Sequence, residues 1–218
     1  DHSQTAVVSP WTNDELRSLM LALDLQSWGI SPRSRVALLL PNGPANAAVL
    51  LGAMLRYCVL PLSPTDVAEA NAGKMRRGGA RCLVTLGAQL EDLAVAVASV
   101  ADALLVRLQH MSSPEGSFVV PIGNISPSES ASVLQHTYGD DTVLVLHTSG
   151  TTAHSKRVPF TLRRLVAAGW ALADSLQLVP GDCGLNMMPL HHVGGIACNL
   201  MAPLVARSRM VFAPSFNA

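Results

Sequence analysis

The chain has 218 residues, of which 49% are apolar and only 14% are charged. It is therefore long and apolar enough to bury a sizeable core, and extensive disorder is not expected. Its 15 basic and 15 acidic side chains balance, without the basic excess typical of proteins that bind nucleic acids or membrane surfaces. No CxxC pair occurs among its cysteines, which favours reduced thiols in a cytoplasmic protein over a disulfide framework or a metal site.

The first predicted element is a helix that starts near Thr12. Thr12 and Glu15 have the spacing of a capping box, leucines follow at helical spacing, and Gly29 is the expected end. After this helix, residues 35–40 (RVALLL) are continuously apolar after Arg35. Such a run predicts a strand that is buried on both faces.

Residues 45–62 form the most apolar stretch of the chain. Residues 45–57 are apolar nearly all round, which predicts a helix covered on both sides, and residues 58–62 predict a strand. Asn46 and Arg56 interrupt the stretch, so we expect these two elements and no transmembrane segment.

Strand and helix patterns then continue to alternate. Thr161 is a suitable N-cap for a helix that runs to about residue 177. The serine- and proline-rich residues 111–117 and 123–132 predict loops. The alternation predicts an α/β fold in which a mostly parallel sheet has helices on both faces. The further expected helices are residues 67–77 and 90–100, and the further expected strands are residues 80–85, 103–108 and 143–146.

A hydroxyl-rich loop follows the strand predicted at residues 143–146. In an open parallel sheet, ligands bind beyond the carboxyl ends of the strands. Hydroxyls, backbone N–H groups and a glycine can surround a polyanion there, and Lys156 adds a positive charge. We therefore predict a polyphosphate site; a serine/threonine turn without a ligand is the alternative. The loop residues are Thr148, Ser149, Gly150, Thr151 and Thr152.

The Walker phosphate-loop motif is the nearest general alternative. Gly150 and Lys156 have its spacing. However, Ser155 replaces its second glycine and Arg157 replaces the hydroxyl that binds magnesium. The sequence therefore departs from this motif at two of its four fixed positions.

The pattern TSGTT-x-x-x-K resembles the phosphate loop of the adenylate-forming (AMP-binding) superfamily, which includes the acyl-CoA synthetases and adenylation domains. Three more blocks are similar to that superfamily and occur in its order: WTNDEL, RVALLLPNG through MLRYCVLPLSP, and NMMPLHHVGGI. The resemblance implies that residues 1–218 are the front part of a large N-terminal AMP-binding domain. The rest of that domain and a C-terminal lid domain would then be absent from this chain.

The resemblance also implies an activity. Family members use ATP and Mg²⁺ to convert a small carboxylic acid to an acyl-adenylate, and they pass the acyl group to a thiol of coenzyme A or of a carrier protein. Thr148, Ser149, Gly150, Thr151, Thr152 and Lys156 would hold the phosphates. His192, Gly194 and Gly195 would border the acyl pocket, and Lys156 and His192 are the candidate catalytic residues. We expect the fragment alone to be inactive.

Several departures from the family pattern leave a second interpretation open. Ala153, Ser155 and Arg157 replace a glycine, a proline and a glycine of the loop, and His191 replaces an aromatic residue. The Arg157 side chain is expected either to reach a phosphate or to face solvent. The alternative function is a non-catalytic binding or assembly module with a degenerate adenylation fold. A hydrolase is less favoured because the chain has no G-x-S-x-G motif.

Overall fold

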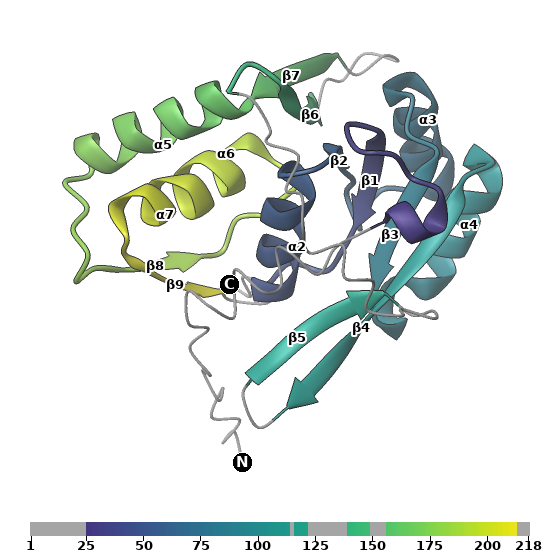
Figure 1. The fold of residues 1–218 in the computed structure, drawn as a ribbon, viewed down its shortest axis with the longest axis horizontal. Coiled ribbons are helices and arrows are strands. Elements are labelled where there is room, and N and C mark those ends of the chain that lie inside the picture. The colour runs from purple at the N-terminus through teal and green to yellow at the C-terminus, as the bar shows by residue number, and fades with distance from the viewer. Residues whose placement is uncertain (1–24, 114–115, 122–138, 149–155, 213–218) are drawn as a thin grey trace.

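The computed structural model describes residues 25–113, 116–121, 139–148 and 156–212. Its centre is a seven-stranded sheet with the order β5-β4-β3-β1-β2-β6-β7 (Figure 1). Strands β1, β2, β3, β4 and β6 are parallel, and β5 and β7 are antiparallel strands at the two edges. The predicted mostly parallel sheet is confirmed. The strands are β1 (Arg35–Leu39), β2 (Cys58–Pro61), β3 (Cys82–Leu86), β4 (Leu104–Ser113), β5 (Gly116–Pro121), β6 (Thr142–His147) and β7 (Arg157–Thr161).

Helices cover both faces of this sheet, as predicted. Figure 1 shows α3 and α4 on one face and α2 on the other, with α5, α6 and α7 in a layer beyond α2. A five-residue π-helical turn joins α6 to α7. The helices are α2 (Pro44–Met54), α3 (Ala68–Gly78), α4 (Glu91–Ala101), α5 (Leu162–Ser175), α6 (Val193–Ile196) and α7 (Ala202–Ala206), with short 3-10 helices at Gln26–Trp28 and Ala88–Leu90.

Two hydrophobic cores lie on the two faces of the sheet. In one core, Leu50 of α2 belongs to the same cluster as Val59 of β2 and Leu200 of the π-helical turn. In the other, Met75 of α3 packs with the strands and α4. Nine of the eleven α2 residues are buried because neighbours cover this helix on both sides. The apolar composition of residues 45–57 predicted this position.

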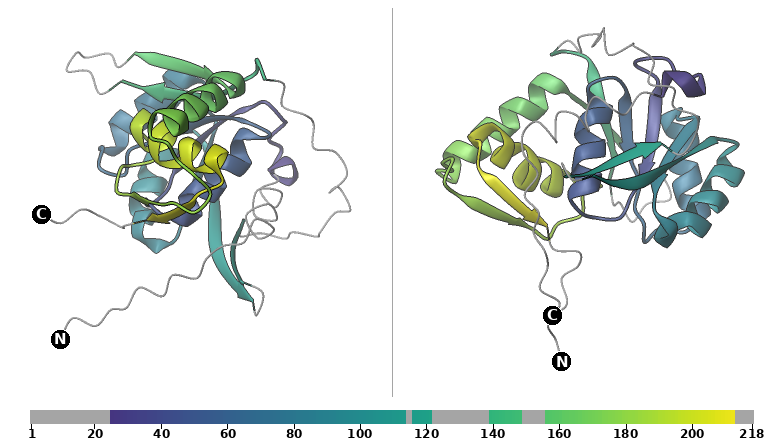
Figure 2. Two further views of the ribbon diagram at one scale, coloured as in Figure 1. Left: turned by 90° about the vertical axis from the view of Figure 1, so that its left-hand side faces the viewer. Right: turned by 60° about the horizontal axis from the view of Figure 1, so that its bottom comes forward.

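One prediction was wrong, at residues 111–117. Strand β4 continues to Ser113, and β5 returns beside it, pairing Ser113 with Gly116 and Gln109 with Val120. Figure 2 shows this hairpin projecting from the body of the fold. Serine and glycine signal the turn, but the β-favouring residues after the turn let the flanking backbone pair.

The ends of other predicted elements can be compared directly. The capping box at Thr12 lies outside the described residues. Gly29 has a left-handed backbone (φ 76°) and ends a 3-10 helix, and the Thr161 hydroxyl accepts a hydrogen bond from the Arg164 N–H at 3.3 Å. The cap predicted at Thr161 is confirmed. No helix in the described ranges is long and apolar enough to cross a membrane.

The sequence did not predict a second, smaller sheet. Its two parallel strands are β8 (Cys183–Asn186) and β9 (Arg209–Phe212). The chain between them contains α6, the π-helical turn and α7. This second sheet, with α5 to α7, forms the part of the molecule that carries the candidate residues His191 and His192.

Candidate active site at the carboxyl edge of the sheet

The candidate phosphate loop starts at Thr148 and ends at Lys156, and these two residues lie side by side at the base of a hairpin. The Thr148 N–H donates to the Lys156 carbonyl at 2.9 Å, and the Lys156 N–H donates to the Thr148 hydroxyl at 3.0 Å. The neighbouring positions His147 and Arg157 pair across β6 and β7. The structure therefore brings the first and last candidate residues together at the carboxyl end of β6. The others, Ser149, Gly150, Thr151 and Thr152, lie outside the described residues, as do Ala153 and Ser155.

Arg157 is exposed at the base of the hairpin, which is one of the two environments expected for it from the sequence. Its guanidinium donates to the backbone carbonyl of Arg77 near the C-terminal end of α3. A positive charge is favourable at that end of a helix because the last carbonyls have no partner within the helix. Arg157 therefore joins the base of the hairpin to α3.

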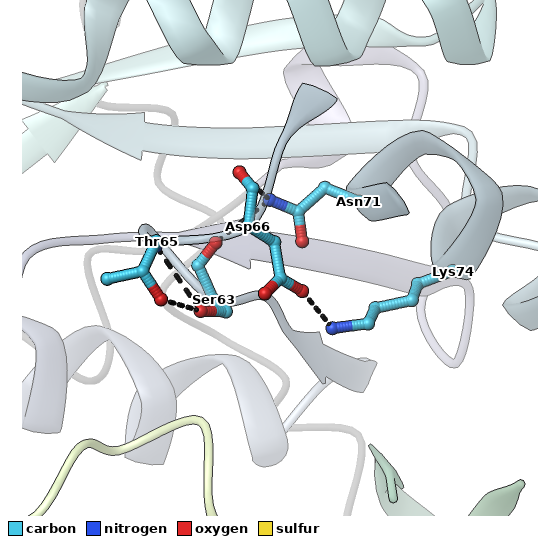
Figure 3. Close-up of polar contacts among 5 residues, drawn as sticks. All are labelled: Ser63, Thr65, Asp66, Asn71 and Lys74. Atoms are coloured by element: carbon cyan, nitrogen blue, oxygen red, sulfur yellow. Dashed lines mark hydrogen bonds and ion pairs between the residues drawn. The ribbon is translucent and has the colours of Figure 1, made fainter. Parts of the chain in front are cut away.

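The loop between β2 and α3 lies at the same edge and contains a polar network (Figure 3). The Ser63 and Thr65 hydroxyls form a 2.8 Å hydrogen bond. Asn71 is fully buried, and its amide donates to the Ser63 carbonyl at 2.9 Å. Lys74 reaches from α3 to the Asp66 carboxylate at 2.5 Å. These bonds fix the loop on α3 and hold the Lys74 ammonium beside it.

The segment with His191 and His192 crosses this edge from the other side. The Leu190 N–H donates to the Asn42 side chain at 3.3 Å, which connects the segment to the carboxyl end of β1. The two imidazole rings have centroids 4.3 Å apart. His192 is exposed and precedes α6, where its carbonyl accepts a hydrogen bond from the Ile196 N–H.

The glycines after His192 permit close packing. A Cβ atom on Gly195 would lie 2.3 Å from the Pro189 carbonyl oxygen. A Cβ atom on Gly194 would lie 2.7 Å from the terminal methyl of Met188. The backbone contact at Gly195 cannot give way without moving the chain, so a side chain is excluded there in this arrangement.

The two histidines at this edge have strongly lowered pKa values. Burial lowers the pKa of His147 to about 4, helped by the charges of Lys74, Arg77 and Arg157. Burial also lowers the pKa of His191 to about 4; His192 and Lys74 act in the same direction and Asp66 opposes them. Both imidazoles are therefore neutral near pH 7. Within the described part of the chain, neither ring nitrogen of His147 has a hydrogen-bond partner.

Sequence reasoning missed Asp66, Lys74 and Arg77 as members of this edge. The charge of Lys74 lowers the pKa of histidines from two separate segments, His147 and His191. The polar sequence SPTD, directly after the strand predicted at residues 58–62, could have indicated this part of the site. Ligands bind beyond the carboxyl ends of strands in such sheets.

Comparison with known proteins identifies the family of this chain. A family model described as AMP-binding enzyme matches residues 11–218. The chain belongs to this family. Sulfoacetate–CoA ligase of Cupriavidus necator is 29% identical over 87% of this chain and 36% of its own length. For 4-coumarate–CoA ligase of Pinus taeda the identity is 28%, over 93% of this chain and 38% of the relative. The chain thus spans less than half the length of these curated relatives.

Solved structures show the same fold. ATP-bound MatB from Rhodopseudomonas palustris superimposes with a TM-score of 0.74 at 22% identity, covering 93% of this chain and 39% of that protein. The o-succinylbenzoate CoA synthetase of Bacillus subtilis, in complex with its acyl-adenylate intermediate, gives a TM-score of 0.69 at 17% identity, covering 94% and 50%. The fold of this AMP-binding chain is thus that of acyl-CoA synthetase-like enzymes.

Proposed function

We propose that the protein containing this chain is an ATP-dependent acid–thiol ligase. It would form an acyl-adenylate from a small carboxylic acid and transfer the acyl group to coenzyme A or to a carrier-protein thiol. The observation that carries this proposal is the hairpin base, where Thr148 and Lys156 lie together at the carboxyl end of β6. Membership of the AMP-binding family and the CoA ligases among its relatives support it.

The first step needs no protein nucleophile. A carboxylate oxygen of the acid attacks the α-phosphorus of ATP, the bond from that phosphorus to the bridging oxygen breaks, and pyrophosphate leaves. In the second step the thiol sulfur attacks the acyl carbonyl, AMP leaves with the former carboxylate oxygen, and the thiol proton goes to solvent. The protein therefore acts by positioning its substrates and stabilising charge.

Thr148 and Lys156 would hold the β- and γ-phosphates, together with Ser149, Gly150, Thr151 and Thr152. The Lys156 ammonium would oppose the charge that develops on the pyrophosphate. His192, Gly194 and Gly195 would border the acyl and thiol pocket. The close contact between Gly195 and Pro189 supports a narrow wall at that position.

Magnesium is used with ATP in this family, and it usually binds substrate phosphates and water with few protein ligands. Across the described ranges, no group of three or more His, Cys, Asp or Glu side chains could hold a metal ion. The Asp66 carboxylate forms an ion pair with Lys74. These described residues therefore do not form a magnesium site.

Pyrophosphate release by the full-length protein tests the proposal. The protein is incubated with MgATP, coenzyme A and a panel of carboxylic acids, beside a known active ligase. We expect release with at least one acid, and we expect Lys156→Ala to lower kcat/KM for ATP by about 100-fold through loss of a charge-assisted contact. Arg164→Ala, which removes an exposed cation from α5, is the matched control. Absence of release across the panel, while the known ligase is active, would exclude this function.

The alternative is a binding module that retains the fold without the chemistry. The observation that favours it is Arg157, whose guanidinium contacts α3 where the family has a glycine. Calorimetry with MgATP separates the two functions. Nucleotide binding that disappears in Lys156→Ala favours a working loop, whereas a folded full-length protein that neither binds MgATP nor releases pyrophosphate with any acid favours the module.

A further inference from the structure

We propose that Lys74 and Arg77 on α3 form a second phosphate-binding pair beside the hairpin base. The pair would contact a phosphoryl group of a bound nucleotide ligand, in addition to the contacts made by Thr148 and Lys156. This inference rests on the proposed function for its ligand, and it adds two residues that the loop motif does not contain.

The placement of the two side chains on α3 is the first observation. Residues three apart on a helix lie on the same face, so Lys74 and Arg77 are neighbours. A Cβ atom on the buried Gly73 would lie 3.1 Å from the Arg77 Nη1 atom. The Arg77 guanidinium therefore lies over Gly73, about one turn back along α3. Glycine at position 73 provides the space for it.

The position of this pair relative to the hairpin is the second observation. Both side chains contribute charge at His147, and this residue directly precedes Thr148. Arg157, at the other end of the hairpin, contributes as well and hydrogen-bonds the Arg77 carbonyl. The hydrogen bond from Arg157 thus places α3 next to the base of the hairpin, within electrostatic reach of His147.

The charge balance is the third observation. Lys74 is paired with Asp66, with side-chain exposures of 19% and 33%, so its ammonium is held in place. The Arg77 guanidinium forms no ion pair or hydrogen bond with any residue that the structure describes, and the residue is exposed. Since His147 is neutral near pH 7, Arg77, Arg157 and Lys156 leave an excess of positive charge at this end of β6.

An excess of positive charge beside the Thr148 hydroxyl and Lys156 favours a phosphate group. Arginine binds phosphate oxygens through two parallel N–H donors, and lysine binds them as a point charge. Both ATP and coenzyme A carry such groups. The shared chemistry is the phosphoryl group, and the source is decided by comparing the two ligands.

Calorimetry on the full-length protein tests the pair with three probes: inorganic pyrophosphate, MgATP and coenzyme A. The variants are Arg77→Gln and Lys74→Gln. Arg76→Gln is the matched control, because Arg76 is on the same helix but its guanidinium donates to the Val100 carbonyl at the α4 side. We expect Arg77→Gln to weaken a phosphate ligand by about 10-fold, which is the size of one charge-assisted hydrogen bond. Arg76→Gln should leave all three affinities unchanged.

The pattern across the probes identifies the source. Weaker binding of pyrophosphate and MgATP assigns the pair to the nucleotide tail, and weaker binding of coenzyme A alone assigns it to that ligand. Arg77→Lys should recover part of the lost affinity, which a purely structural role for Arg77 would not predict. If Arg77→Gln and Lys74→Gln both behave like Arg76→Gln with every probe, while remaining folded, the pair does not exist.

Failure of the Lys74–Arg77 proposal can be distinguished from failure of the ligase proposal. Pyrophosphate binding that depends on Arg77, without pyrophosphate release from any acid, would retain the pair and exclude the ligase. Conversely, a ligase that loses activity in Lys156→Ala but is indifferent to Arg77 and Lys74 would retain the proposed function and overturn this inference.

Discussion

The two sheets of this molecule differ in how they are covered. In β3 of the main sheet all five residues are buried, whereas in β8 only Asn186 is buried. The main sheet has helices on both faces, and its central strands are therefore mostly apolar. The smaller sheet, with its more exposed strands, depends more on its backbone pairing and on a few side chains. The candidate site joins the two regions, with the hairpin from one and the His191 segment from the other.

The surface shows the same difference. Only a few large apolar side chains are exposed between residues 25 and 108, but many are exposed from residue 158 onward. Trp170 and Leu176 have exposed fractions of 58% and 60%, in or directly after α5. The comparison teaches that the hairpin base follows a strand whose apolar residues are all buried, whereas the second region is exposed along α5 and β8, although Leu190 and Ile196 beside its histidines are buried.

Truncating a core leucine is expected to have the largest effect. Leu144 in β6 is fully buried, so Leu144→Ala should lower the free energy of unfolding by about 3 kcal/mol through lost burial and the cavity left behind. Leu185→Ala in β8, where the side chain is 54% exposed, should change it by less than about 0.5 kcal/mol. Urea denaturation measures the free energy of unfolding of both variants. If both variants lost the same free energy of unfolding, the two regions would not differ in packing.

Adding a methyl group at Gly195 comes next. Its Cβ atom would meet the Pro189 backbone, so Gly195→Ala should destabilise the fold by roughly 1–3 kcal/mol and displace the His191 segment. Gly181→Ala is the matched control, because a Cβ atom there meets nothing within 4 Å. Thermal unfolding of both variants, with pyrophosphate release by the full-length protein, provides the measurement. An unaffected Gly195→Ala would mean that the segment is loose enough to move.

The comparison also bears on what the sequence predicts. The helix expected at residues 67–77 is α3 (Ala68–Gly78), because its local pattern matched its environment on the sheet. The adjacency of Thr148 and Lys156 at one strand end also agrees with the loop expected there. Strand β8 was missed because Gly184 and its neighbours carry no apolar run or alternation, and its strand character comes from pairing with the distant β9.

The role of α3 at the site could not be predicted locally. Lys74 and Arg77 approach His147 because β2 and β6 are neighbours in the sheet, although they are far apart in sequence. Strand order depends on tertiary packing, and no pattern within residues 68–78 encodes it. The part of the site given by a loop motif was accessible from the sequence, and the part given by strand order was not.

Acidification should weaken the fold in both regions. The pKa of His147 and of His191 is about 4 in the folded protein, against an ordinary value of 6.5. Between these values the unfolded chain binds protons that the folded chain does not, so the free energy of unfolding falls as the pH falls from about 6.5 to about 4. The decrease should be modest, because both imidazoles are partly exposed to solvent.

The variants His147→Gln and His191→Gln assign this effect to the two regions. Each should reduce the slope of stability against pH in that window, and their effects at pH 8, where neither folded nor unfolded chain protonates these sites, serve as the reference. Urea denaturation at a series of pH values gives the slopes. If neither variant changes the slope, the two imidazoles are not held neutral by the fold.

The smallest expected effect is at Gly73, where stability and binding should change in opposite directions. Gly73→Ala should stabilise α3 by up to about 1 kcal/mol, because alanine favours a helix more than glycine. The new methyl group would press on the Arg77 guanidinium, 3.1 Å away, and should weaken pyrophosphate binding about twofold, or roughly 0.4 kcal/mol. A double-mutant cycle isolates the contact: with Arg77→Gln already present, Gly73→Ala should not alter the affinity. An affinity loss that persists without the arginine would show that the methyl group acts on the helix itself, and that Arg77 does not need the space which Gly73 provides.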